Sequence, residues 1–206
     1  AKAHDRLARV LFRAGDPKRA YTEFQSAAEA DKSMPIAELA MASLAIDKDV
    51  NKAEQWIKLA LNKGPNDLRT RIGATEFFLR NNRVDEAKAQ ADEALKLDPN
   101  GLDSNMIMGI LARMQGDYKK AEKHLTTAHL LAPANAVINN HLALSLIEMP
   151  DEASRLRGLQ YAEINAKQNP TIPEVIAALG WVNYKMGRRA EAQRAFSAVL
   201  NAASTS

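Results

Sequence analysis

The chain contains no cysteine among its 206 residues. This absence excludes a disulfide framework, a thiolate zinc site and a cysteine nucleophile, but it does not fix the compartment. Aromatic residues make up only 5% of the chain, and no apolar run approaches the ~20 residues that a membrane-spanning helix needs. We therefore expect a soluble protein without a membrane span, either cytoplasmic or periplasmic.

A strong charge of one sign is also missing. The chain has 28 Lys and Arg against 25 Asp and Glu, a net charge of +3. The two signs are interspersed along the sequence, as on a solvated surface, whereas nucleic-acid-binding proteins concentrate Lys and Arg on one face. We expect no nucleic-acid partner.

Catalytic and metal-binding patterns are absent too. No HExxH, GxSxG, phosphate-binding glycine loop or dinucleotide-binding glycine pattern occurs. The four histidines are His4, His124, His129 and His141, and they lack metal-ligand spacing, so we interpret them as surface or half-buried packing residues. The chain is predicted to have no catalytic residues, no cofactor and no metal, and not to be an enzyme.

What the chain does have is an internal repeat. One small residue recurs at intervals of 33, 34, 34, 37 and 34 residues: Ala20, Ala53, Ala87, Ala121, Gly158 and Ala192. A proline recurs at 34, 34 and 37 residues: Pro65, Pro99, Pro133 and Pro170. Two independent markers thus give the same period and the same three-residue insertion. A period of this length is typical of stacked structural repeats.

Each repeat is predicted to contain two helices. Within a repeat, apolar residues recur at spacings of three and four, as in Ala121, Leu125 and Ala128, which places them on one helix face. The residues that favour the left-handed backbone conformation of a helix-ending turn are Gly15, Asn82, Gly116 and Gly187. Acidic residues such as Asp85 and Asp151 stand at expected helix starts, where they stabilise the positive end of the helix dipole.

This pattern resembles the tetratricopeptide repeat family, whose motif has small residues at positions eight, twenty and twenty-seven and a proline near the end. The resemblance implies an all-α, right-handed superhelical solenoid of six helix-turn-helix repeats, with about twelve antiparallel helices in a single domain over 1–206. The six repeats are 1–33, 34–67, 68–101, 102–135, 136–172 and 173–206. One hairpin cannot bury its apolar face alone, and stacked copies bury each other's faces.

The chain departs from the family motif at several positions. Lys32 stands where the first closing proline is expected, and Met41 is large for a position that favours small residues. The fifth repeat has Gly158 in place of alanine and contains the insertion within the stretch "EMPDEASRLRG". We expect this insertion to lie in the turn between the two helices of that repeat.

The resemblance further implies that the first helix of each repeat lines a concave groove, through positions two, five, nine, twelve and thirteen. In the first three repeats these positions carry mixed charges, whereas the last three present methionines, aliphatic residues and aromatics. Such side chains suit a protein-binding surface, although apolar residues at helical spacing also form cores. The predicted partner-binding residues are Met106, Ile110, Arg113, Met114, Asn140, Leu144, Ile147, Trp181 and Tyr184.

Function is therefore predicted to reside in a surface. The leading hypothesis is a non-catalytic scaffold that binds a peptide, helix or partner protein in the groove. The alternative is an accessory or regulatory region of a larger enzyme, or of an envelope or secretion assembly. An RNA-binding helical repeat is less favoured, because the fifth positions show no recurring polar code. These positions hold Asp5, Glu38, Ile72, Met106, Asn140 and Ala177.

The end of the last repeat raises one more expectation. Terminal repeats need a polar outer face, yet Phe196, Val199 and Leu200 cannot all be covered by one neighbouring helix. We therefore expect either that the natural protein continues beyond Ser206 or that this surface is covered by another molecule, including a second copy through self-association.

Overall fold

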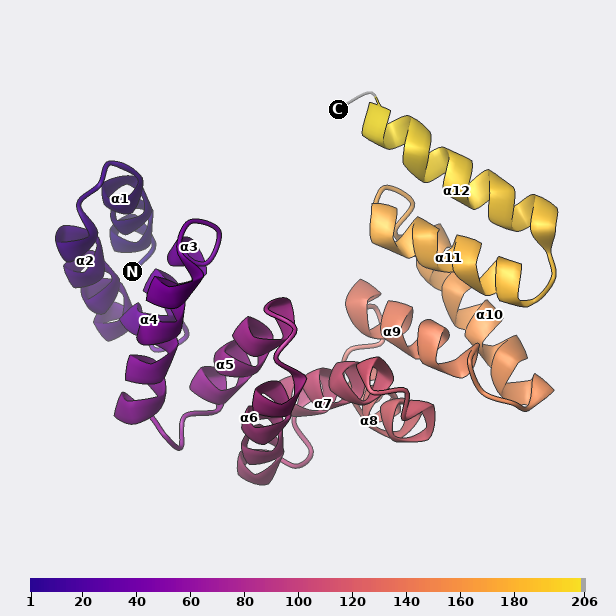
Figure 1. Cartoon of the computed structure of the whole chain (residues 1–206), viewed down its shortest axis with the longest axis horizontal. Helices are drawn as coiled ribbons and strands as arrows, with labels where there is room; N and C mark the ends of the chain where they lie inside the picture. Colours follow the sequence, from indigo (N-terminus) through magenta and orange to yellow (C-terminus); the bar gives the residue numbers. More distant parts are fainter. Residues whose placement is uncertain (205–206) are drawn as a thin grey trace. The chain divides into compact units, whose positions relative to one another are not determined.

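The computed structural model describes residues 1–204, with side chains through Ala202. Within this part of the chain twelve helices occur and no strand, and consecutive helices pair into hairpins (Figure 1). The predicted all-α fold of helix-turn-helix repeats is confirmed. The helices of the described region are all too short or too polar to cross a bilayer.

Contacts divide the chain into two compact units, unit 1 (Ala1–Leu97) and unit 2 (Asp98–Ser206). Each contains three of the six predicted repeats. The hairpins of unit 1 are α1 (Lys2–Arg13) with α2 (Pro17–Ala30), α3 (Ala37–Ala45) with α4 (Val50–Lys63), and α5 (Leu68–Arg80) with α6 (Val84–Leu97). Those of unit 2 are α7 (Leu102–Met114) with α8 (Tyr118–Leu131), α9 (Ala136–Leu146) with α10 (Glu152–Gln168), and α11 (Pro173–Lys185) with α12 (Arg189–Ser204). That all six form one continuous solenoid stays a prediction.

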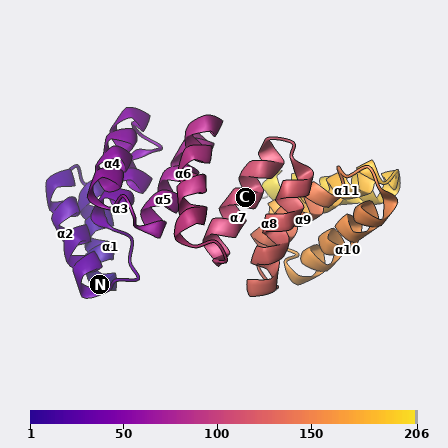
Figure 2. The same ribbon diagram turned by 90° about the horizontal axis from the view of Figure 1, so that it is seen from below.

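Within each unit the hairpins stack in chain order. In unit 1, α2 contacts α3 and α4 contacts α5, so the three hairpins follow one another (Figure 2). In unit 2, α9 contacts both α7 and α11, and the second helices α8 and α10 contact the first helix of the next hairpin. The first helices of unit 2 therefore lie side by side, which is the arrangement that a shared binding face requires.

The predicted turn residues have the backbone conformation expected of them. Gly15, Gly116 and Gly187 have φ values of 86°, 77° and 76°, and Asn82 has a φ of 57°. These are the described residues with positive φ, a conformation that glycine adopts without strain and that asparagine tolerates. Four of the six hairpin turns are thus encoded by a single residue each.

The insertion in the fifth repeat lies mainly in a helix, and the expectation that it lies in the turn was wrong. In the other five repeats the second helix begins three residues before the aligned small residue, whereas α10 begins at Glu152, six residues before Gly158. Asp151 caps this earlier start, because its side chain accepts a hydrogen bond of 2.8 Å from the Ser154 backbone N–H. The insertion therefore lengthens α10 at its N-terminus.

Small residues occupy the helix crossings of the hairpins α7–α8 and α11–α12, as predicted. A Cβ atom placed on Gly109 of α7 would lie 2.5 Å from Leu125 Cγ of α8, and one on Gly180 of α11 would lie 2.7 Å from the Phe196 ring of α12. Met41 is fully buried in the core of unit 1 despite its size. Close helix approach at these points lets alanines fill most of the core.

Candidate functional site

The predicted site residues all lie in unit 2, on α7, α9 and α11 or directly after α9. Their spacing places them on one side of each helix, and α9 contacts both of the other helices. We call this surface the α7–α9–α11 face, defined by Met106, Ile110, Arg113, Met114, Asn140, Leu144, Trp181 and Tyr184.

Exposure differs among these residues. Met114, Trp181 and Tyr184 are 45%, 42% and 56% exposed, so their side chains are open to a partner. Met106 and Leu144 are half-buried and pack against the core clusters beneath the face. The face thus has exposed apolar groups at its two sides and a partly buried apolar floor between them.

Ile147 does not belong to this face, so its inclusion among the partner-binding residues was wrong. It is only 2% exposed and packs in a core cluster with Ala143, Ala162 and Val182. The reason is the close approach of α10: a Cβ atom on Gly158 would lie 3.1 Å from the Ile147 backbone nitrogen. Ile147 follows the last residue of α9 and is covered by the two helices that come after it.

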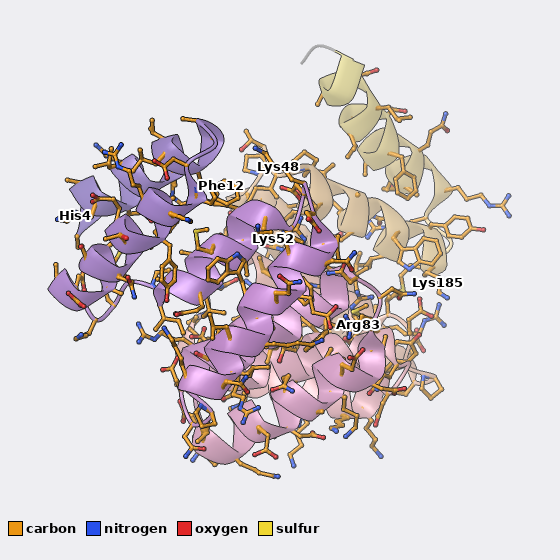
Figure 3. The ribbon with its side chains drawn as sticks, turned by 60° about the vertical axis from the view of Figure 1, so that its left-hand side comes forward. His4, Phe12, Lys48, Lys52, Arg83 and Lys185 are labelled. Atoms are coloured by element: carbon orange, nitrogen blue, oxygen red, sulfur yellow. The ribbon has the colours of Figure 1, made fainter. Side chains whose placement is uncertain are left out.

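Three side-chain hydrogen bonds connect the elements of the face. Between α7 and α9, Arg113 Nε donates a hydrogen bond of 3.0 Å to His141 Nδ1. Between the turn after α9 and α11, Glu148 accepts hydrogen bonds from Trp181 Nε1 at 3.3 Å and from Lys185 Nζ at 2.8 Å. Lys185 Nζ also lies 5.7 Å from the Trp181 ring centroid (Lys185 is labelled in Figure 3). These contacts hold Trp181 and Arg113 in defined positions.

The Arg113–His141 contact joins a cation to a neutral imidazole. Burial lowers the pKa of His141 to about 4, and the Arg113 guanidinium beside it contributes in the same direction. Burial also lowers the pKa of Arg113 below its usual value. At neutral pH the imidazole is therefore uncharged and accepts the Arg113 hydrogen bond through Nδ1, which leaves its proton on Nε2.

His141 is a functional candidate that sequence reasoning missed. It was interpreted only as a packing residue, and no motif connects it to Arg113, which lies 28 residues earlier. Of the other two histidines of unit 2, His124 is buried and His129 is half-buried, and both pack within the unit. His124 Nδ1 lies 2.9 Å from Asn105 Oδ1, and His129 Nδ1 lies 2.7 Å from Asn139 Oδ1.

The first helices of unit 1 differ from those of unit 2, because their charged groups are paired internally. Arg9 donates two hydrogen bonds to Asp5, and Arg80 Nη2 lies 3.0 Å from Asp47 Oδ1. Lys48 Nζ lies 5.6 Å from the Phe12 ring centroid (Figure 3). The mixed charges predicted for the first three repeats are therefore largely neutralised by their own neighbours.

The C-terminal hairpin exposes an apolar surface, as expected from the sequence. Leu200 is 70% exposed, Phe196 is 36% exposed, and Val199 is half-buried. Together with Tyr184, Phe196 and Leu200 line an open, mainly apolar hollow between α11 and α12. Self-association through this surface stays a prediction.

No cluster of His, Asp and Glu side chains that could hold a metal ion occurs among the described residues. The arrangement offers apolar contact area, hydrogen-bond donors and one half-buried cation.

Comparisons with known proteins agree with this fold. A tetratricopeptide repeat family model matches residues 78–135. The chain is 26% identical over 194 residues to the TPR repeat-containing protein PA4667 of Pseudomonas aeruginosa, covering 93% of this chain and 32% of that protein. The chain therefore spans about a third of the length of this curated relative.

Solved structures show the same architecture. PilW, described as a widely conserved type IV pilus biogenesis factor, has a TM-score of 0.72 at 20% identity, covering 96% of this chain and 91% of that one. A tetratricopeptide repeat protein from Parabacteroides merdae has a TM-score of 0.72 at 11% identity, covering 97% and 78%. MamA of Desulfovibrio magneticus has a TM-score of 0.64 at 19% identity, covering 80% and 92%. At these identities the likeness concerns the fold alone.

Proposed function

The chain is a tetratricopeptide repeat protein, and from this premise we propose that its α7–α9–α11 face binds a segment of a partner protein. The fold is that of a protein-interaction scaffold. Binding takes place on one face of unit 2, and the exposed Trp181 and Tyr184 of α11 contribute most of the binding free energy.

The observation that carries the proposal is the exposure of Trp181 and Tyr184. Their ring centroids lie 5.7 Å apart at an interplanar angle of 34°, and Glu148 and Lys185 hold the Trp181 ring in place. Exposed aromatic side chains with fixed positions lose little entropy on binding, and tryptophan and tyrosine are enriched among the residues that dominate binding energy. Met114 on α7 adds an adaptable apolar group.

The test is a binding measurement with variants of exposed residues, so that folding is preserved. Peptides are first selected on the full chain from a displayed library of random dodecapeptides, and their affinities are then measured by fluorescence anisotropy. Trp181→Ala is expected to weaken binding at least tenfold, since loss of a dominant aromatic contact costs about 2 kcal/mol or more.

Leu130→Ala is the matched control. Leu130 lies on α8, is 75% exposed and is no part of the α7–α9–α11 face, so its truncation should leave the affinity unchanged. Equal effects of Trp181→Ala and Leu130→Ala, with unchanged helical content, would place the binding surface elsewhere. Variants of Leu144 are not used in this test, because this side chain packs against the core and its replacement would also affect folding.

A second candidate function is that of an accessory region within a longer protein. The observation that favours it is that the chain spans 32% of its curated relative's length. In that case the same face would bind another part of the same assembly, and the length of the natural protein would decide between an independent scaffold and such a region.

A further inference from the structure

On the α7–α9–α11 face, Arg113 carries a positive charge that unit 2 does not neutralise. Within the described residues of unit 2, no ion pair joins its guanidinium to a carboxylate, and its hydrogen bond goes to His141. Two other cations of unit 2, by contrast, form ion pairs: Arg157 with Glu122 and Lys185 with Glu148, each at 2.8 Å. The Arg113 side chain is also half-buried, so water compensates its charge only in part.

His141 orients this guanidinium without neutralising it. Because the imidazole is uncharged at neutral pH, it accepts the Nε hydrogen bond but contributes no negative charge. The two Nη groups make no hydrogen bond to another group of unit 2. The Arg113 side chain is half-buried, so part of it is open to solvent. The Nη groups form the end of the guanidinium fork, whose geometry matches the two oxygens of a carboxylate.

The surroundings strengthen an ion pair at this point. Met106, Ile110 and Met114 lie on the same side of α7 as Arg113, and an apolar environment increases the attraction between opposite charges. One cation that has no carboxylate partner within the described residues of unit 2 fits one carboxylate. A nucleic-acid backbone needs a row of cations, whereas the turn after α9 places the acidic Glu148 beside Trp181 and Lys185.

We infer that the partner segment presents an aspartate or glutamate side chain to Arg113, flanked by apolar residues that contact Met114 and Trp181. This inference rests on the proposed function, because it names the chemistry of the segment that would bind to the same face.

The experiment uses dodecapeptides joined to the display particle through their C-termini, so that the acidic groups they offer are side chains. Selection on the wild-type chain is expected to enrich sequences with Asp or Glu next to apolar residues. A selected peptide is then synthesised with an amidated C-terminus, and its affinity is compared with that of the peptide carrying Gln in place of the acidic residue. On the wild-type chain this replacement should weaken binding by about tenfold to a hundredfold, as expected for a charged hydrogen bond.

The same comparison on Arg113→Gln completes a double-mutant cycle. There the two peptides should bind with equal affinity, and on Arg113→Lys the preference should be reduced but retained. Arg194→Gln is the matched control, since it removes one positive charge from the exposed surface of α12, and it should keep the full preference. If Arg113→Gln fails to fold, Arg113→Lys takes its place: an unchanged acidic preference on Arg113→Lys, or no such preference on the wild-type chain, would contradict the inference.

The outcomes separate the two proposals. If peptides bind, Trp181→Ala weakens them and no acidic preference depends on Arg113, this inference is wrong and the proposed function stands. The inference is equally wrong if only peptides with a free C-terminal carboxylate, or single-stranded RNA, compete for Arg113. If no peptide is selected, or the selected peptides ignore Trp181, both proposals fail.

Discussion

Replacement of Gly109 by alanine should destabilise the protein, against the general rule that alanine stabilises a helix interior. An added Cβ would lie 2.5 Å from Leu125 Cγ, 2.9 Å from Leu125 Cδ2 and 3.1 Å from the Leu125 backbone nitrogen. Carbon atoms in contact are normally about 3.5–4.0 Å apart, and Leu125 is fully buried. Relief of the clash therefore requires α7 and α8 to move apart.

The magnitude follows from two opposing effects. Overpacking of a close-packed core costs about 1–3 kcal/mol, whereas replacing glycine by alanine within a helix contributes about 0.5–1 kcal/mol of stability. We expect Gly109→Ala to lower the free energy of unfolding by about 1–2 kcal/mol, measured by urea denaturation followed by circular dichroism.

Gly73→Ala is the matched control, since Gly73 also lies inside a helix, α5. Its added Cβ would lie 2.9 Å from Leu39 Cδ2, the end of a half-buried and flexible side chain that can rotate away. This variant should be neutral or up to about 1 kcal/mol more stable. In a chain that already carries Leu125→Ala, Gly109→Ala should no longer lower the free energy of unfolding. If Gly109→Ala is as stable as the wild type, the close crossing of α7 and α8 is not as described.

Three further predictions concern individual polar groups. Because the folded state holds His141 neutral, with a pKa of about 4 against 6.5, the unfolded state binds more protons between these values. The free energy of unfolding should therefore fall by up to about 3 kcal/mol as the pH drops from 6.5 through 4. Urea denaturation at a series of pH values measures this loss. His141→Gln should make the free energy of unfolding less dependent on pH, whereas the control His4→Gln, at an exposed histidine, should leave the dependence unchanged. Lys63→Met should lower the free energy of unfolding by about 1–3 kcal/mol in the same assay, because it leaves the buried Glu38 carboxylate with one side-chain donor, the Tyr21 hydroxyl. The control Lys58→Met removes an exposed ion pair and should change the free energy of unfolding little. Asp151→Ala should speed hydrogen exchange of the Ser154 amide, while Asp151→Asn should not, since asparagine also caps helices; equal exchange in both variants would contradict the capped start of α10.

The hairpins could be predicted from the sequence because their determinants are local. Gly15, Asn82, Gly116 and Gly187 each fix a turn through one backbone conformation, and the 34-residue period repeats the same helix faces. Asp151 was expected near a helix start, but the lengthening of α10 by the insertion was missed, because the residues around Asp151 also suit a turn. The hydrogen bond that the Ser154 backbone N–H donates to the Asp151 side chain fixes the start of the helix there.

The candidate site was predicted less completely, because it depends on contacts between repeats. Position in the repeat placed Trp181 and Tyr184 on an exposed face, and both are exposed. The same rule failed for Ile147, since the lengthened α10 and its Gly158 cover that position. The partner of Arg113 could not be predicted, because His141 contacts it only through the packing of α9 against α7.

The central claim, that the α7–α9–α11 face binds a protein segment, is tested most directly by the two tryptophans. Trp181 lies on this face, whereas Trp56 stacks on Tyr21 in unit 1 with ring centroids 5.1 Å apart. The measurement is a titration of the chain with a selected dodecapeptide, followed through the two indole N–H resonances, which Trp181→Phe assigns. The account predicts that the Trp181 resonance shifts and saturates with the peptide while the Trp56 resonance stays in place. A bound peptide that leaves the Trp181 resonance unchanged, or that shifts Trp56 instead, would contradict it.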